Sequence, residues 1–143
     1  GNSKINQINQ SQTNESPKVL IVEDNHINQV VLKTMLKRLD IESQTADHGG
    51  KALKILEQAH ANGEVFDLIL MDCQMPVMDG FEATKCIRNS GESYANTPII
   101  AVTANALTTD KESCLSAGMN DYLSKPYQLD DIREILQDWL AHY

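Results

Sequence analysis

Five side chains that can bind metal or transfer groups stand at the ends of short strand-like runs: Glu23, Asp24, Asp72, Thr103 and Lys125. Carboxylates crowded together repel one another, and their partial burial is unfavourable. A bound cation removes that cost, and an all-oxygen site with room for water and phosphate suits Mg²⁺ better than Ca²⁺. Beside Mg²⁺, one carboxylate can act as a nucleophile toward a phosphoryl group, which the lysine and the hydroxyl help to align.

Each of these residues alone also has a simpler interpretation. Glu23 or Asp24 can cap the helix that is expected to begin near residue 26. Asp72 can begin a turn, and Thr103 can bond a neighbouring backbone group. Lys125 can be a solvated surface charge, as most lysines are. No single residue decides between the two interpretations, but the five together favour the phosphoryl site.

The elements that must position these groups follow from alternating patterns along the chain. Short apolar runs alternate with helical patterns, which predicts an α/β fold with a doubly wound parallel sheet of five strands and five helices. The expected strands are 19–22, 43–46, 68–71, 99–102 and 121–124, and the expected helices are 26–39, 50–60, 80–89, 105–117 and 128–141. The polar second strand should lie at an edge, and the first and third strands should be central.

Ligands of an open parallel sheet gather at the carboxyl ends of its strands. Because Asp72 ends a central strand, we expect it to be the nucleophile. The 128–141 helix carries one apolar stripe, which predicts core packing. The 105–117 helix has few large apolar groups, so it should be held less firmly and end at Gly118 as a left-handed cap.

The length of the chain, 143 residues, predicts a single domain, and its composition limits the classes of partner. The net charge of -8 argues against a nucleic-acid-binding face, and no apolar stretch is long enough to cross a bilayer. Three widely spaced cysteines indicate neither a disulfide framework nor a zinc site, which favours a cytoplasmic location. Residues 1–16 are rich in Asn, Gln and Ser and are expected to be a flexible linker or an expression remnant, with the domain at 17–143.

Four segments of the sequence carry a family resemblance. They are VLIVEDNHINQ (19–29), DLILMDCQMPVMDGFEA (67–83), PIIAVTANA (98–106) and GMNDYLSKP (118–126). In this order they resemble the receiver domain of two-component response regulators, over residues 17–143. The resemblance implies a flavodoxin-like fold with strand order 2-1-3-4-5.

The resemblance also implies roles for the acids. Asp72 would accept a phosphoryl group from a phosphohistidine on a partner. Asp24, Asp72 and the backbone carbonyl of Gln74 would bind Mg²⁺, and Glu23 would act through a bound water. The domain would thus serve as the phosphoacceptor of a phosphorelay in signal transduction.

Three further residues take roles from the same resemblance. Lys125 would contact the phosphoryl oxygens, and its bond to Pro126 is expected to be cis. Thr103 and Tyr122 resemble a switch pair, in which the hydroxyl turns toward the phosphate and the ring follows inward. Phosphorylation would then change the surface of the 105–117 helix, the last strand and the last helix.

Within this family, the segment EDNHINQ, with Asn25, Asn28 and Gln29 after the acids, looks most like the C-terminal receivers of hybrid sensor histidine kinases. The implied partners are a histidine kinase core upstream and a histidine phosphotransfer domain downstream. Neither nucleic acid nor a membrane contact of this domain is expected, although the parent chain can still be membrane-anchored. A monomer is favoured.

Two alternatives keep the same fold. Magnesium-dependent phosphatases with an aspartate nucleophile typically carry a second aspartate two residues later, where this chain has Gln74, so sustained turnover is disfavoured. A binding module that is never phosphorylated usually lacks one of the acids, the threonine or the lysine, and all are present here. At most self-dephosphorylation is expected of the domain alone, which leaves its status as an enzyme open. Cys73 is interpreted as a packed side chain rather than a redox sensor.

Overall fold

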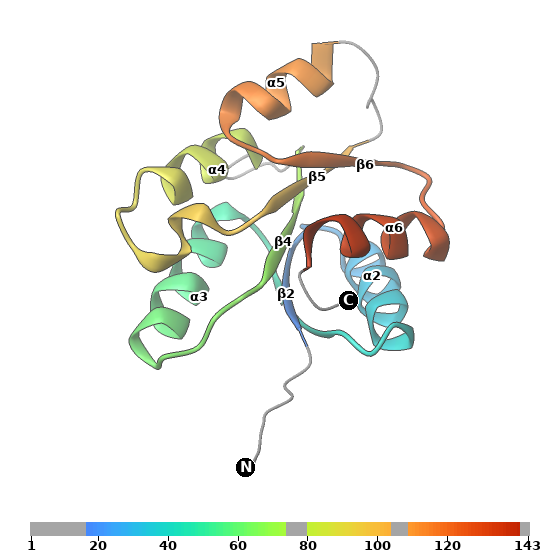
Figure 1. The fold of residues 1–143 in the computed structure, drawn as a ribbon, viewed down its shortest axis with the longest axis horizontal. Coiled ribbons are helices and arrows are strands. Elements are labelled where there is room, and N and C mark those ends of the chain that lie inside the picture. Colours follow the sequence, from blue (N-terminus) through green and yellow to red (C-terminus); the bar gives the residue numbers. More distant parts are fainter. Residues whose placement is uncertain (1–16, 74–79, 104–108, 141–143) are drawn as a thin grey trace.

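The computed structural model describes residues 17–73, 80–103 and 109–140, and these contain one five-stranded sheet (Figure 1). Its strands are β2 (Lys18–Val22), β3 (Glu42–Ala46), β4 (Leu68–Asp72), β5 (Ile99–Thr103) and β6 (Asp121–Ser124). They lie in the order β3-β2-β4-β5-β6, which is 2-1-3-4-5 in chain order, and every pairing is parallel. The doubly wound parallel sheet predicted from the sequence is therefore confirmed.

Helices cover both faces of this sheet. They are α2 (His26–Arg38), α3 (Gly49–Ala61), α4 (Gly80–Arg88), α5 (Thr109–Ala117) and α6 (Leu129–Trp139). In Figure 1, α2 and α6 lie on one face, and α3, α4 and α5 lie on the other. The predicted start of α5, at 105, lies outside the described residues. A short 3₁₀ turn, η1 (Ser93–Asn96), was not predicted, because four residues are too few to show a helical period.

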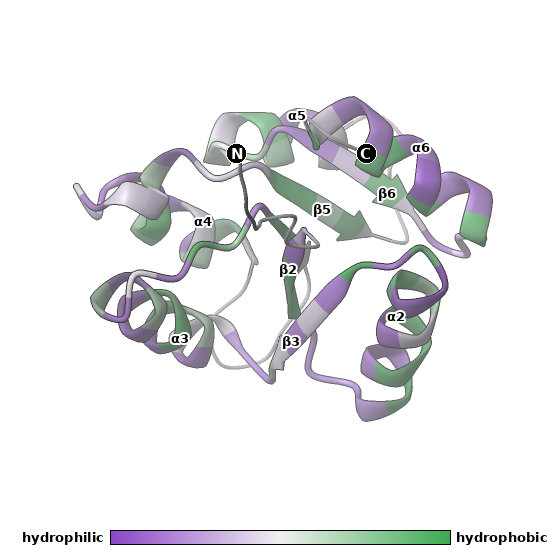
Figure 2. Cartoon of the chain, turned by 60° about the horizontal axis from the view of Figure 1, so that its bottom comes forward, coloured by the Kyte–Doolittle hydropathy of each residue, from purple (hydrophilic) through white to green (hydrophobic). Residues whose placement is uncertain are grey.

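Burial along the strands follows their place in the sheet. All five residues of β4 and all five of β5 are buried, as expected for strands covered on both faces. In β3 the exposed and partly buried residues alternate, and this strand lies at the edge as its polar sequence predicted. Figure 2 shows the contrast, with β5 in hydrophobic green and β3 mostly in white and purple.

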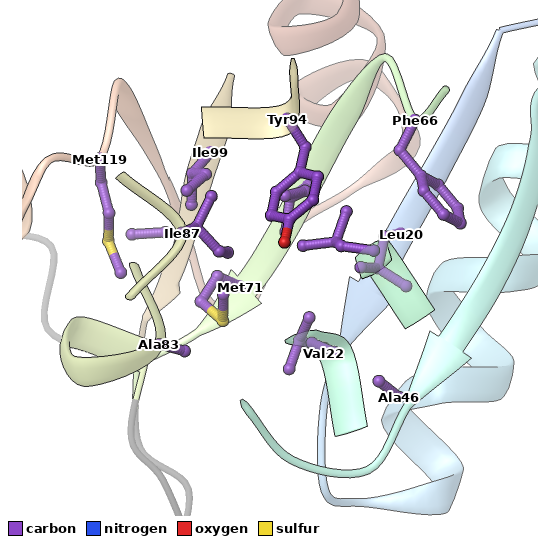
Figure 3. Close-up of a cluster of buried hydrophobic side chains, with 14 of the residues drawn as sticks. Leu20, Val22, Ala46, Phe66, Met71, Ala83, Ile87, Tyr94, Ile99 and Met119 are labelled. Atoms are coloured by element: carbon purple, nitrogen blue, oxygen red, sulfur yellow. The ribbon is translucent and has the colours of Figure 1, made fainter. Parts of the chain in front are cut away.

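Two apolar clusters hold the helices to the sheet. On the α3, α4 and α5 side, Leu20, Met71 and Ile99 from three strands meet Ile87 of α4 and Tyr94 of η1 (Figure 3). On the α2 and α6 side, the cluster is built from leucine, isoleucine and valine of both helices and of four strands. The sheet is therefore fixed from both sides, and its carboxyl ends are left to carry polar groups.

The two helices beside β6 differ in packing as the sequence predicted. In α6, Ile132 and Leu136 are buried in the apolar stripe. In α5, Cys114 and Ala117 are buried among the side chains that the structure describes. After α5, Gly118 has a φ of 108°, and its N–H donates to the carbonyl of Leu115, which confirms the left-handed cap.

Candidate functional site

The carboxyl ends of β2 and β4 bring three acids together. Carboxylate oxygens of Glu23, Asp24 and Asp72 all lie within 4.8 Å of one another. Glu23 and Asp72 are buried, whereas Asp24 is exposed. The ammonium of Lys125, from the end of β6, lies 3.8 Å from Glu23 Oε1 and 4.0 Å from Asp72 Oδ1. The result is a partly buried cluster of three acids, with the ammonium of Lys125 beside two of them.

The helix cap at this edge is neither of the acids, so that interpretation of Glu23 and Asp24 is wrong. Asn25 caps α2, because its side-chain oxygen accepts a hydrogen bond from the N–H of Asn28 at 3.0 Å. The N–H of Asn25 donates in turn to Glu23 Oε2, also at 3.0 Å. An asparagine therefore takes the capping role, and both carboxylates remain at the strand end.

Gln29 fixes the backbone beneath the acids. Its side-chain amide donates to the carbonyl of Glu23 at 2.6 Å and to Asp47 Oδ1 at 3.0 Å. The hydrogen bond from Gln29 is the main reason that the pKa of Asp47 lies below its usual value, and the charge of Lys51 adds to it. The sequence marked Gln29 only as a family feature. Gln29 stands three residues before Leu32, so both lie on the same buried face of α2. This spacing was the available sign that Gln29 is a buried polar residue.

Burial has the largest effect on the pKa values in the acidic cluster. It raises the pKa of Glu23 to about 7, and the charge of Asp72 adds to the rise, while the N–H of Asn25 and the charge of Lys125 act against it. Burial likewise raises the pKa of Tyr127 to about 12, with contributions from the charges of Glu23 and Asp72. Within the described part of the chain, Glu23 Oε1 has no hydrogen-bond donor. A buried acceptor of this kind suits a bound cation or its water.

Gly80, the first residue of α4, lies directly against the end of β4. A Cβ at this position would overlap the carbonyl oxygen of Asp72 and lie 3.0 Å from the Cα of Cys73. Thr84 Oγ1 donates to the carbonyl of Gly80 at 2.7 Å and holds the first turn of α4 in place. Glycine at 80 therefore lets α4 begin beside the strand that carries Asp72.

The remaining predicted residues lie on β5 and β6. Thr103 is buried at the end of β5, and its carbonyl accepts from the N–H of Lys125 at 2.8 Å. Tyr122 pairs in register with Ala101, two residues before Thr103, so Tyr122 and Thr103 face the same side of the sheet. The Lys125–Pro126 peptide is cis, as expected. Gln74 lies outside the described residues.

The family comparison agrees with this geometry. The model of the response regulator receiver domain matches residues 19–137. The chain belongs to the response regulator receiver domain family. Among relatives of this receiver domain is hybrid signal transduction histidine kinase K of Dictyostelium discoideum, 39% identical over 131 residues, with 87% of this chain and 10% of the relative covered.

Solved structures of other receivers have the same fold. The receiver domain of sensor histidine kinase PA1611 from Pseudomonas aeruginosa, with magnesium in its active site cleft, is 43% identical, with a TM-score of 0.74 and coverage of 87% of this chain and 98% of that one. A second match comes from the co-crystal of the Saccharomyces cerevisiae phosphotransfer protein Ypd1 with the Ssk1 receiver domain. This matched structure is 35% identical to the chain, with a TM-score of 0.76, and the match covers 90% of this chain and 91% of the matched one.

This receiver domain corresponds to only a part of its curated relatives. It spans about a tenth of the length of the first ones that it matches. Among the described residues, no helix combines the length and the apolar character that a bilayer crossing requires.

Proposed function

We propose that this receiver domain is the phosphoacceptor of a phosphorelay and that Asp72 takes the phosphoryl group from a phosphohistidine. The observation that carries the proposal is the placement of Asp72. Its buried carboxylate ends a central strand, within 4.8 Å of two further acids and 4.0 Å from the ammonium of Lys125. This arrangement presents a nucleophilic oxygen with the neighbouring charges that phosphoryl transfer requires.

Mg²⁺ is the cofactor that this acidic cluster fits. Glu23 and Asp24 place carboxylate oxygens around Asp72, and Glu23 Oε1 is a buried acceptor without a donor among the described residues. We assign Asp24, Asp72 and the Gln74 carbonyl as its ligands, with Glu23 acting through a bound water. When bound, the ion neutralises charge on the phosphoryl oxygens. The magnesium-bound receiver of PA1611 supports this assignment.

The chemical step forms one bond and breaks one. A carboxylate oxygen of Asp72 attacks phosphorus, the N–P bond of the phosphohistidine breaks, and its electron pair stays on the imidazole of the donor. The product is an acyl phosphate on Asp72. The ammonium of Lys125, 4.0 Å from Asp72 Oδ1, pairs with the phosphoryl oxygens and stabilises the added negative charge.

Thr103 and Tyr122 translate this charge into a change of shape. The Thr103 hydroxyl gains a hydrogen bond to the phosphoryl group, which favours one of two arrangements at the end of β5. Tyr122 lies on the same face of the neighbouring strand and follows inward. The surface of α5, β6 and α6 is then the output of the switch.

The partner is a histidine phosphotransfer domain, and α2 offers a place for it to dock. Ile27, Val30 and Val31 are 71%, 49% and 38% exposed, respectively, on the helix that begins two residues after Asp24. Exposed apolar groups beside a reaction centre mark a docking surface. The Ypd1–Ssk1 co-crystal supports this class of partner.

We place the domain in the cytoplasm, as part of a hybrid histidine kinase that is longer than the present chain.

The phosphoacceptor role is tested by intact mass after incubation with acetyl phosphate and Mg²⁺. We expect one added phosphoryl group on the parent protein and none on Asp72→Asn or without metal. If no adduct accumulates, released phosphate is assayed. Steady release would support the phosphatase alternative, and no release would support a binding module that is never phosphorylated.

The docking surface has a separate test in Ile27→Glu. We expect this variant to accept a phosphoryl group from acetyl phosphate at the parent rate but from a phosphorylated histidine phosphotransfer domain at least about tenfold more slowly, since a charge in an apolar interface is unfavourable. Lys33→Glu on the same helix is the control for charge alone. Equal transfer rates for Ile27→Glu and the parent would place the docking surface elsewhere.

A further inference from the structure

Two buried thiols meet directly behind the phosphoacceptor. Cys73 follows Asp72 at the end of β4, and Cys114 lies in α5, 41 residues further along the chain. Their sulfur atoms are 3.7 Å apart, and both residues are almost fully buried, at 6% and 1% exposure. All three cysteines of the chain are in its described part, and all three are thiols. The third, Cys86, is exposed on α4.

The distance between the two sulfurs is short enough for a bond to form with small movements. A disulfide has a sulfur–sulfur bond of about 2.05 Å, so the 3.7 Å contact must close by less than the width of one atom. Cys114 is on α5, which buries only a second small residue, Ala117, among its described side chains. A helix held by so few apolar groups can shift toward β4 at low cost.

We propose that Cys73 and Cys114 form a dithiol site that a hydroperoxide oxidises to a disulfide within the domain. Cys73 is the more exposed residue of the two. Its sulfur attacks the peroxide oxygen and becomes a sulfenic acid, releasing water or an alcohol. The sulfur of Cys114 then attacks the sulfur of Cys73, the S–S bond forms, and a second water leaves. Two thiols lose two electrons and two protons, and the peroxide is reduced.

Cys73 is packed in the apolar cluster, as expected from the sequence, and the proposed site adds a redox role to that packing. Cys114 follows Cys73 by 41 positions in the sequence, and only the fold brings their sulfur atoms together. Burial in an apolar cluster slows thiol oxidation. The reaction therefore proceeds at the rate at which local opening of α5 exposes the sulfurs, rather than at the rate of an exposed thiol such as Cys86.

The disulfide would tie the strand that carries Asp72 to the helix that the switch moves. It would fix α5 against β4 and limit the change of surface that phosphorylation produces. This consequence rests on the proposed function, whereas the formation of the disulfide does not.

The first test is chemical and uses the full chain in the Cys86→Ser background, which removes the exposed thiol. After treatment with hydrogen peroxide we expect a loss of about 2 Da, the two hydrogens of the thiols, with no dimer. Digestion without reductant should give one peptide pair containing Cys73 and Cys114. Dithiothreitol should restore the mass. Cys86→Ser/Cys114→Ala is the matched control and should show no such loss.

The exposed Cys86 of the parent protein sets the oxidant dose. The proposal is wrong if Cys73 and Cys114 are both still alkylated after unfolding, at a peroxide dose that fully oxidises Cys86 and after a time in which the amides of α5 exchange completely. A linkage of either residue to a second chain would also overturn it. The Cys86→Ser/Asp72→Asn variant separates this result from the phosphoacceptor proposal, because it should form the disulfide although it accepts no phosphoryl group.

The consequence for α5 is measured by hydrogen exchange in the oxidised and reduced Cys86→Ser protein. We expect slower exchange in α5 after oxidation, by at least about tenfold, with little change in α6. Equal exchange in α5 before and after oxidation would refute the proposed effect on this helix, even if the disulfide forms.

Discussion

The helices α5 and α6 flank the same edge strand, β6, on opposite faces of the sheet, and they are held there in different ways. In α6, Ile132 and Leu136 are buried against the sheet, and Trp139 Nε1 donates to Asp121 Oδ2 of β6 at 2.9 Å. In α5, small side chains provide the burial, and Leu115 is 49% exposed.

This difference separates support from signalling. Burial of apolar surface stabilises by about 25 cal/mol per Å² and fixes α6 in one position. The buried side chains that the structure describes in α5, Cys114 and Ala117, are small, so less apolar contact is lost when this helix moves. The proposed switch requires α5 to change position after phosphorylation, and a helix anchored as α6 is would resist such a change. We therefore assign α6 mainly to the stability of the domain and α5 to its response.

The strongest test of this comparison is a pair of leucine substitutions. Leu136→Ala should destabilise the domain by about 4 kcal/mol, because it leaves a cavity at a fully buried position. Leu115→Ala, at the exposed position in α5, should stay within about 0.5 kcal/mol of the parent. Urea unfolding followed by circular dichroism measures both, and similar losses in the two variants would contradict the distinction.

The second prediction concerns the acid Glu23. Burial of its carboxylate is unfavourable, whereas burial of the apolar side chains of α6 is favourable. Because the pKa of Glu23 rises from 4.5 to about 7 on folding, the metal-free folded domain binds a proton that the unfolded chain releases in this range. The contribution of Glu23 to the stability of the domain should fall as the pH rises from about 5 to 7, and should stay constant above that. The rise in the pKa of Glu23 corresponds to a loss of roughly 3 kcal/mol in the free energy of unfolding.

Glu23→Gln tests that pH dependence, because it keeps the size of the side chain and removes its charge. In the presence of a chelator, the variant should be more stable than the parent at pH 8, and the difference should shrink toward pH 5. Added Mg²⁺ should stabilise the parent at pH 8 far more than the variant. Parallel stability curves for the two proteins across this pH range would show that Glu23 is not the responsible group.

Arg88 supplies the polar anchoring that α5 has in place of an apolar stripe. Its guanidinium donates to the carbonyls of Gly118, Ala95 and Thr97 at 2.8, 2.9 and 2.8 Å and to Asn120 Oδ1 at 2.6 Å. Burial lowers the pKa of Arg88, but a guanidinium remains charged at neutral pH.

Arg88→Ala should lower the free energy of unfolding by about 2 kcal/mol, because three partly buried carbonyls lose their donors. Arg88→Lys should recover less than half of the loss, since one ammonium cannot reach four acceptors on different segments. Thermal unfolding gives the ranking. Full recovery by lysine would mean that the charge, and not the planar arrangement of donors, holds the end of α5.

Much of this fold was readable from local patterns. Strands β4 and β5 are continuous apolar runs, and the stripe of α6 follows a single helical period. The acids were predictable because each stands at a strand end, where the topology gathers side chains at one edge.

What could not be predicted depends on partners far apart in the chain or on competition between neighbours. Asn25 is the cap instead of Glu23 or Asp24. Residue type alone does not decide between Asp24 and Asn25, because aspartate and asparagine are both good caps. The amide of Gln29 reaches Asp47, and Cys73 meets Cys114, only after the sheet is assembled. Sequence spacing carries no record of such contacts.

The smallest expected effect is a difference in local opening that leaves global stability unchanged. In the unmodified domain, the amides of α5 should exchange with solvent at least about tenfold faster than those in the middle of α6, because less apolar surface is exposed when α5 opens. With acetyl phosphate and Mg²⁺, exchange should change in α5 and remain nearly constant around Leu136 in the core of α6. In the Asp72→Asn variant, α5 should still exchange faster than α6, but acetyl phosphate and Mg²⁺ should not change its exchange. Equal protection of the two helices in the unmodified domain would remove the physical basis for treating α5 as the responsive element, because a helix anchored as firmly as α6 has no easy path to a second position.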